Sequence, residues 1–340
     1  MISCSRQEPE KASHLRATAL TLQPIQFMFA FLFYTDAAAV FWALATIGIA
    51  LPQDQEELQL DWQSSIASAA IGAVAIAHRQ TNVVWVAFAV LYGLWRRFPH
   101  PLCSRWRRRA TQVFVWLLPH VCLACMFLGF IVHNGGVVVG DSAHHRVAFH
   151  GAQLCYSSFM TAVLFFPVLI PSIRRLFFSG KSGRSQRSLV VVASLTIVAA
   201  ALVWFGTHAH AFLLADNRHI PYLLWRRVLG TSVWVRLALC PLYALSAILL
   251  HDTLRHSSGS NVPTILWGCC SAAVLVPTPL WELRYATIPV IVFGLLLGPT
   301  KGSTWEFLSM VWRAIGIGMM LIFLLWTRTD ASGETSRLMW

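Results

Sequence analysis

The sequence predicts an all-α, polytopic membrane protein. Hydrophobic residues make up 56% of its 340 residues and charged residues only 12%, whereas soluble domains carry about 25% charged residues. Several apolar stretches reach the roughly 20 residues that a helix needs to cross the hydrocarbon core of a bilayer. The basic residues lie in short blocks between these stretches, as they do in cytoplasmic loops of membrane proteins.

Five stretches are the clearest predicted spans: Thr111–Val132, Leu154–Ile173, Leu189–Leu214, Val228–Leu250 and Phe307–Trp326. The stretches at 262–277 and 285–297 are shorter and contain prolines, which membrane helices tolerate when neighbouring helices satisfy the freed backbone groups. Residues 17–51 and 64–95 are each interrupted by polar residues, so each is expected to form one long tilted helix or a hairpin of two short ones.

The expected organisation is therefore a helix bundle of about nine to eleven transmembrane helices. It forms a single domain over residues 17–327, with a polar N-terminal segment at 1–16 and a lumenal tail at 328–340. The basic blocks at 96–109 and 173–187 are expected to face the cytosol. Since the net charge of +12 comes largely from such blocks, we read it as a topology signal and expect no nucleic-acid partner.

Two ionisable residues, Asp36 and Arg79, interrupt the N-terminal apolar stretches. A charged side chain at membrane depth costs about 2.5–3.5 kcal/mol on insertion scales, which makes such a residue a functional candidate. One reading is a structural ion pair or a side chain that snorkels to the membrane interface. The other is that Arg79, with Gln80 and Asn82, binds a lipid phosphate, because paired guanidinium N–H groups match phosphate oxygens.

Polar residues also gather in three segments that alternation of the spans assigns to the lumenal side. The segment at 140–153 contains Asp141 and three histidines, His144, His145 and His150. The spacing of the histidines matches no common zinc pattern, so we expect no metal. Solvated histidines at the membrane interface, or contact with sugar or phosphate, are the readings left open.

The second segment, at 210–227, is the densest. It contains Asp216, Asn217, Arg218, His219 and Trp225. Aromatic rings stack on sugars, amides and carboxylates bind hydroxyls, and guanidinium neutralises phosphate, so this set suits a sugar phosphate. The alternative is an aromatic belt with basic anchors.

The third segment carries Glu282, Arg284 and Tyr285 just after two prolines. Because prolines break the preceding helix, these side chains are expected at a helix start. A local ion pair is the alternative reading.

Four carboxylates across the chain are candidates for a catalytic base. They are Asp36, Asp141, Asp216 and Glu282.

In their order, these motifs resemble an endoplasmic reticulum family. The motifs are Tyr34-Thr35-Asp36, Arg79-Gln80-Thr81-Asn82-Val83-Val84-Trp85, Gly140-Asp141 with His145, His150, Gln153 and Tyr156, Asp216-Asn217-Arg218-His219 with Trp225-Arg226-Arg227, and Glu282-x-Arg284-Tyr285 with Pro289. The family is the dolichyl-phosphate-glucose-dependent alpha-1,2-glucosyltransferases, which add the third and last glucose to the lipid-linked oligosaccharide. The resemblance runs from about residue 20 to 297.

The resemblance implies a GT-C-like membrane fold in the endoplasmic reticulum membrane. It implies dolichyl phosphate glucose as donor, diglucosylated Man9GlcNAc2-PP-dolichol as acceptor, an inverting displacement and no cofactor. Arg79, Gln80, Asn82, His145, His150, Asn217, Arg218, His219, Trp225, Arg284 and Tyr285 are the substrate-binding residues it suggests.

One departure from the family pattern concerns the N-terminus. Family members carry an extra first helix and a long lumenal loop with an Asp-Glu pair near a His, the usual place of the base. Met1–Ala17 contains Glu8 and Glu10 but no such motif, so we expect this base to be missing.

Two further readings stay open beside glucosyl transfer. One is a catalytically incomplete relative that binds lipid-linked sugar or modulates another membrane protein. The other is a transporter, which would be expected to show internal repeats and ionisable residues in both halves; no repeat is visible in the sequence.

Overall fold

Helices form almost all of the structure, as the apolar stretches predict. The computed structural model describes residues 17–31, 35–52, 61–98, 110–138, 147–178, 182–215, 220–297, 303–325, 327–329 and 335–337. The chain divides into two compact units that alternate along the sequence. The first unit comprises Met1–Leu32, Val147–Thr264 and Leu275–Trp340, and the second unit comprises Phe33–Arg146 and Ile265–Val274.

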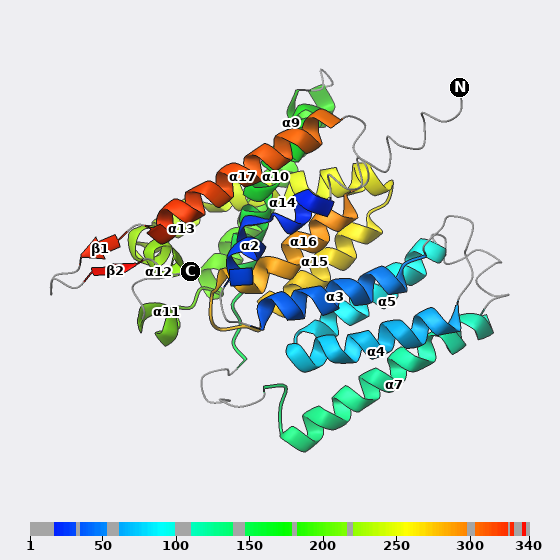
Figure 1. Ribbon diagram of the computed structural model, residues 1–340. Helices are drawn as coiled ribbons and strands as arrows, with labels where there is room; N and C mark the ends of the chain where they lie inside the picture. Colours follow the sequence, from blue (N-terminus) through cyan, green and yellow to red (C-terminus); the bar gives the residue numbers. More distant parts are fainter. Residues whose placement is uncertain are drawn as a thin grey trace. The chain divides into compact units, whose positions relative to one another are not determined.

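The second unit is built on four helices that lie alongside one another (Figure 1). They are α3 (Asp36–Ala50), α4 (Trp62–His78), α5 (Asn82–Arg97) and α7 (Ala110–Asn134). The Asp61 carboxylate accepts hydrogen bonds from the backbone N–H groups of Gln63 and Ser64 and so begins α4. The hairpin reading of residues 64–95 is thus confirmed, since α4 and α5 are separate helices with a break at 79–81.

Small residues allow these helices to approach closely. Ala39 and Ala43 of α3, Ala75 of α4 and Ala89 of α5 are buried, as is typical where membrane helices pack. The Arg97 guanidinium donates to the carbonyl oxygen of Ala50 at 2.7 Å, which joins the ends of α5 and α3.

The first unit contains the remaining helices, drawn from green to red in Figure 1 apart from α2. They are α2 (Pro24–Phe31), α8 (Ala152–Leu164), α9 (Phe166–Phe177), α10 (Ser182–Phe205), α11 (Ala211–Ala215), α12 (Ile220–Leu224), the π-helical η1 (Trp225–Leu229), α13 (Val233–Ala238), α14 (Cys240–Ser258), the 3-10 helix η2 (Leu283–Ala286), α16 (Thr287–Leu296) and α17 (Ser303–Leu325). Helix α15 (Val262–Leu275) begins and ends in this unit, but its residues 265–274 belong to the second unit.

Helices α8, α10 and α14 form the core of the first unit. Their contacts include the buried residues Cys155, Tyr156, Val203, Cys240 and Tyr243. The tail is the one part of the described chain with strands. β1 (Thr327–Thr329) pairs antiparallel with β2 (Thr335–Arg337).

The expected span at 154–173 is formed by two helices that are bent relative to one another. Helices α8 and α9 meet at Phe165 with a bend of 99°. Pro167 has no N–H to donate to the carbonyl of Val163, so the helical hydrogen-bond ladder is interrupted there. Similarly, the stretch at 189–214 divides at Gly206 into α10 and the short α11.

The structure is that of a polytopic membrane protein. Among the described residues, three helices are long and apolar enough to cross a membrane, or four if the bent pair α8–α9 counts as one span. Shorter apolar helices account for several of the other expected spans. Only 11% of the apolar window of α7 is buried, and its exposed side chains, such as Phe114 and Met126, suit a surface covered by lipid. The total of nine to eleven spans and the single domain over 17–327 stay predictions.

Candidate functional site

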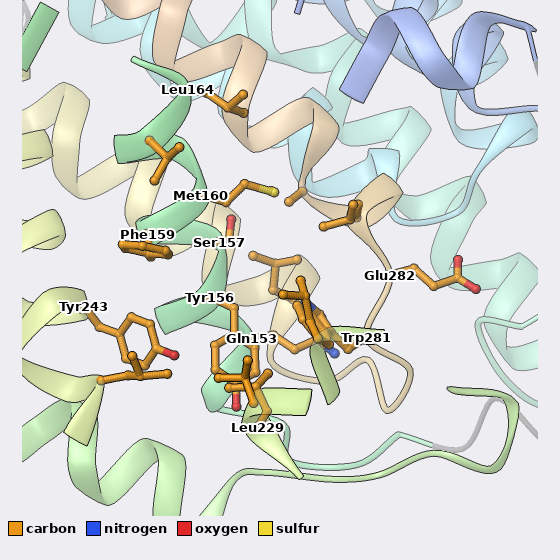
Figure 2. Close-up of a pocket in the computed structure, with 17 residues that line it drawn as sticks. Gln153, Tyr156, Ser157, Phe159, Met160, Leu164, Leu229, Tyr243, Trp281 and Glu282 are labelled. Carbon is orange, nitrogen blue, oxygen red and sulfur yellow. The ribbon is translucent and has the colours of Figure 1, made fainter. Parts of the chain in front are cut away.

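A largely apolar cavity of about 370 Å³ opens in the first unit. Side chains of α8, α12, η1 and α14 and of the segment before α16 line it. Figure 2 shows Phe159 and Tyr243 on one side and Trp281 beside Gln153 and Tyr156. Its volume lies within the range of small-molecule sites.

Aromatic side chains form one end of the cavity. Tyr156 packs against Trp281 with ring centroids 5.1 Å apart and against Tyr243 at 5.7 Å. Of the predicted site residues that the structure describes, only Glu282 lines this cavity. The sequence reasoning missed Trp281, although its position next to Glu282 was a signal that could have found it.

Glu282 lies at the edge of the cavity. It has an extended backbone and directly precedes η2, so the expected position at a helix start is confirmed. In Figure 2 its carboxylate points away from Tyr156 and Tyr243, and its side chain is 30% exposed. A carboxylate at the rim of an apolar cavity can accept hydrogen bonds from the hydroxyls of a polar head group.

Arg284 pairs with this carboxylate. Its Nε contacts Oε2 of Glu282, and its guanidinium lies 5.3 Å from the ring centre of Tyr285. The structure thus brings together all three predicted residues of the segment 282–285, as one ion pair with an aromatic neighbour. A guanidinium carries four N–H groups besides Nε–H, and their planar arrangement matches the oxygens of an anion.

His150 lies just before α8 and is only 1% exposed. Its Nδ1 is 3.1 Å from the carbonyl oxygen of Pro279, and its ring meets that of His208 edge to face at 5.5 Å. Burial, together with His208, lowers the pKa of His150 to about 4, against the opposing effect of its backbone hydrogen bonds. The side chain is therefore neutral near pH 7.

Trp225 begins the π-helix η1 and packs against the hydrophobic core of the first unit. The guanidinium of Arg236 lies 5.7 Å from its ring centre, which is within the range of a cation–π contact. This places a half-buried aromatic ring and a cation close together next to the cavity-lining residues of η1.

In the second unit, Asp36 and Arg79 form an ion pair with a nitrogen–oxygen distance of 2.7 Å. The Asp36 side chain is 4% exposed and that of Arg79 20%. Asn82 is fully buried and donates to the carbonyl oxygens of Ala39 and Ala75. These hydrogen bonds favour a structural role for Asn82. The neighbouring Gln80 is half-buried.

Several predicted residues cannot be placed. Asp141, His145, Asp216, Asn217, Arg218 and His219 lie outside the described residues. Within the described ranges, no group of three or more histidine, cysteine, aspartate or glutamate side chains is arranged to hold a metal ion.

Comparison with known proteins gives a consistent result. A family model described as the DIE2/ALG10 family matches residues 1–295. The relatives include proteins of Rattus norvegicus, 30% identical over 83% of this chain and 63% of the relative, of Homo sapiens, 28% identical over 87% and 67%, and of Arabidopsis thaliana, 25% identical over 97% and 76%. Each bears the name "Dol-P-Glc:Glc(2)Man(9)GlcNAc(2)-PP-Dol alpha-1,2-glucosyltransferase".

The chain spans 63% of the length of the rat relative that it matches. No solved structure matches it.

Proposed function

Since the chain belongs to the DIE2/ALG10 family, we propose that it transfers glucose from dolichyl phosphate glucose to diglucosylated Man9GlcNAc2-PP-dolichol in alpha-1,2 linkage. The names of the relatives support this substrate pair. The observation on the chain itself that supports it best is the Glu282–Arg284 pair at the rim of an apolar cavity. Both substrates are amphiphiles with an isoprenoid chain and a phosphorylated sugar head.

The cavity suits the apolar part of such a substrate. Leucine, valine, methionine and aromatic side chains make up most of its lining, and these exclude water from an isoprenoid chain. At the rim, the guanidinium of Arg284 is the group that would stabilise the charge of the departing dolichyl phosphate.

The reaction is a single in-line displacement. The 2-hydroxyl oxygen of the acceptor glucose attacks the anomeric carbon of the donor, the bond from that carbon to the phosphate oxygen breaks, and a carboxylate takes the hydroxyl proton. Dolichyl phosphate is the leaving group. The beta linkage of the donor thereby becomes an alpha linkage.

The base is one of four carboxylates: Asp36, Asp141, Asp216 or Glu282. Of the two that the structure describes, Glu282 is the better candidate. Both carboxylates are ion-paired, Glu282 with Arg284 and Asp36 with Arg79, but the Glu282 side chain is 30% exposed at the cavity rim and that of Asp36 only 4%.

The remaining proposed substrate contacts are those that the family resemblance suggests. They are Arg79, Gln80, Asn82, His145, His150, Asn217, Arg218, His219, Trp225 and Tyr285, on the face that we assign to the lumen of the endoplasmic reticulum. For Asn82 and His150, whose polar atoms already bind backbone carbonyls, we propose support of neighbouring residues in place of direct contact.

The test is complementation of cells that lack the terminal glucosyltransferase. Lipid-linked oligosaccharides are profiled after expression of the chain and of its Glu282→Ala, Arg284→Ala and Arg218→Ala variants. We expect the triglucosylated form with the chain itself and the diglucosylated form with each variant. Arg255→Gln, which changes an exposed arginine of α14 outside the cavity lining, is the matched control and should rescue fully.

Protein levels in the endoplasmic reticulum are measured in parallel. If the chain reaches that membrane and the diglucosylated form still accumulates, glucosyl transfer by this chain is refuted, and a catalytically incomplete relative is the reading that remains.

A further inference from the structure

Five consecutive backbone carbonyls just before Trp281 accept hydrogen bonds from one other segment. Residues 148–153, at the start of α8, supply all the donors. The pairs are His150 N to Val276 O at 2.8 Å, Ala148 N to Pro277 O at 3.2 Å, Gln153 Nε2 to Thr278 O at 2.6 Å, His150 Nδ1 to Pro279 O at 3.1 Å and Gln153 Nε2 to Leu280 O at 3.1 Å.

The segment 276–280 depends on these donors. Pro277 and Pro279 have no N–H group, so the segment cannot build a regular hydrogen-bond ladder of its own. Buried carbonyls without a donor are costly, and the path of such a segment is fixed by whatever group satisfies them. Here the donors come from residues more than 120 positions earlier in the chain.

A carbonyl oxygen only accepts, so the contact with Pro279 assigns a proton to Nδ1 of His150, and the contacts with Thr278 and Leu280 assign the NH₂ group of Gln153 to their side. Nε2 of Gln153 also lies 2.9 Å from Nδ1 of His150, so the two side chains meet at this set of carbonyls. Both side chains are at least 98% buried, His150 being 1% and Gln153 2% exposed. His150 is also absent from the cavity lining, so it acts from behind the wall of the cavity.

The start of α8 is itself anchored on its other side. The backbone N–H of Ala152 donates to the carbonyl of Gly206, and Nε2 of His208 bonds to the carbonyl oxygen of Phe149 at 2.7 Å. Segment 276–280 is therefore attached to a part of the first unit that the end of α10 holds in place.

We propose that His150 and Gln153 are positioning residues, which hold segment 276–280 and thereby place Trp281 at the aromatic end of the cavity and Glu282 at its rim. As far as catalysis is concerned, this inference rests on the proposed function. The hydrogen bonds themselves can be tested without it.

The experiment compares isosteric and conservative variants of the purified chain. Gln153→Glu keeps the size but replaces the donor by a carboxylate that faces two carbonyls. His150→Leu removes the Nδ1 donor, whereas His150→Asn keeps a side-chain N–H near that place. Ser158→Ala is the control on the same helix, because its hydroxyl bonds only the carbonyl of Leu154 among the described contacts.

Hydrogen–deuterium exchange of the peptide containing residues 280–288 is the first measurement. We expect exchange about tenfold faster or more in Gln153→Glu and His150→Leu, since each removes hydrogen bonding that holds the segment. In His150→Asn and Ser158→Ala, exchange should stay close to that of the parent chain. Unchanged exchange in both disruptive variants would overturn the proposal.

Glucosyl transfer is the second measurement. Misplaced reacting groups lower kcat by up to about 100-fold, so kcat should fall in the two disruptive variants while KM changes less, and His150→Asn should restore most of it. Faster exchange with unchanged kcat would refute the positioning role. If the parent chain transfers no glucose at all, the proposed function fails, and the exchange comparison still decides whether the two residues hold the segment.

Discussion

The indole Nε1 of Trp312 donates a hydrogen bond of 2.7 Å to the carbonyl oxygen of Val163. That carbonyl belongs to the last turn of α8, at the bend where Pro167 cannot supply the usual helical donor. Next to it, the guanidinium of Arg313 lies 4.7 Å from the ring centre of Phe165, the residue at the bend itself. Helix α17 thus stabilises the interruption between α8 and α9.

Replacing Trp312 by phenylalanine should therefore destabilise the first unit. Hydrogen bonds between membrane helices contribute about 0.6 kcal/mol on average and up to about 1.7, so we expect a loss of that size in the free energy of unfolding. Unfolding in mixed micelles measures it. Trp234→Phe is the control, because Trp234 is 71% exposed; an equal loss in both variants would contradict a specific role of the bond.

Asp36 and Arg79 should behave as a coupled structural pair. Removing one partner of a buried ion pair leaves an uncompensated charge and costs about 3–5 kcal/mol; since Arg79 is partly exposed, we expect the lower end for Asp36→Ala or Arg79→Ala. The double variant should lose much less than the sum. Additive losses in the free energy of unfolding would contradict this coupling.

Replacing two helical glycines of the second unit by alanine should have different effects on stability. A Cβ on Gly93 of α5 would lie 2.7 Å from the carbonyl oxygen of Ala50, the same oxygen that Arg97 binds. Gly93→Ala should thus cost about 1–3 kcal/mol through overpacking. Gly48 of α3 has no heavy atom within 4 Å of such a Cβ.

Gly48→Ala should accordingly be neutral or stabilise the protein by up to about 1 kcal/mol, because alanine favours the helix over glycine. The melting temperatures of Gly93→Ala and Gly48→Ala test both expectations. A loss of stability in Gly48→Ala as large as that in Gly93→Ala would show that close approach at Ala50 is not the cause.

The stability of the first unit should fall as the solution is acidified. The pKa of His150 is about 4 in the folded protein and about 6.5 when unfolded, so the unfolded state binds more protons between these values. The free energy of unfolding should hence drop by up to about 3 kcal/mol from pH 6.5 to pH 4. His208 is the titratable group facing this ring.

The non-titrating His150→Asn variant separates the two histidines, since it retains His208. Its melting temperature relative to that of the parent chain should rise steadily as the pH is lowered. A difference that does not depend on pH would mean that the buried imidazole does not cause the acid sensitivity.

The sequence by itself was enough to predict the class of protein and much of its local structure. Hydropathy identified the long apolar helix α7 within residues 110–134. The polar residues at 78–82 indicated an interruption, although they left one long helix or a hairpin open, and the break between α4 and α5 lies there. The prolines at 277 and 279 located the helix start next to Glu282. These features depend on residues close together in the chain, so rules on hydropathy and proline geometry reach them.

Only the tertiary structure decided which distant groups meet. In three places a side chain meets a backbone carbonyl of a distant or neighbouring helix or loop. Trp312 bonds to the carbonyl of Val163, His150 to that of Pro279 and Asn82 to that of Ala75. Read along the sequence, His150 and Asn82 looked like ligand-binding residues, because an imidazole or an amide has the same hydrogen-bonding groups whether it faces a substrate or a carbonyl. Which of the two it meets follows from how the helices pack, and no local pattern carries that information.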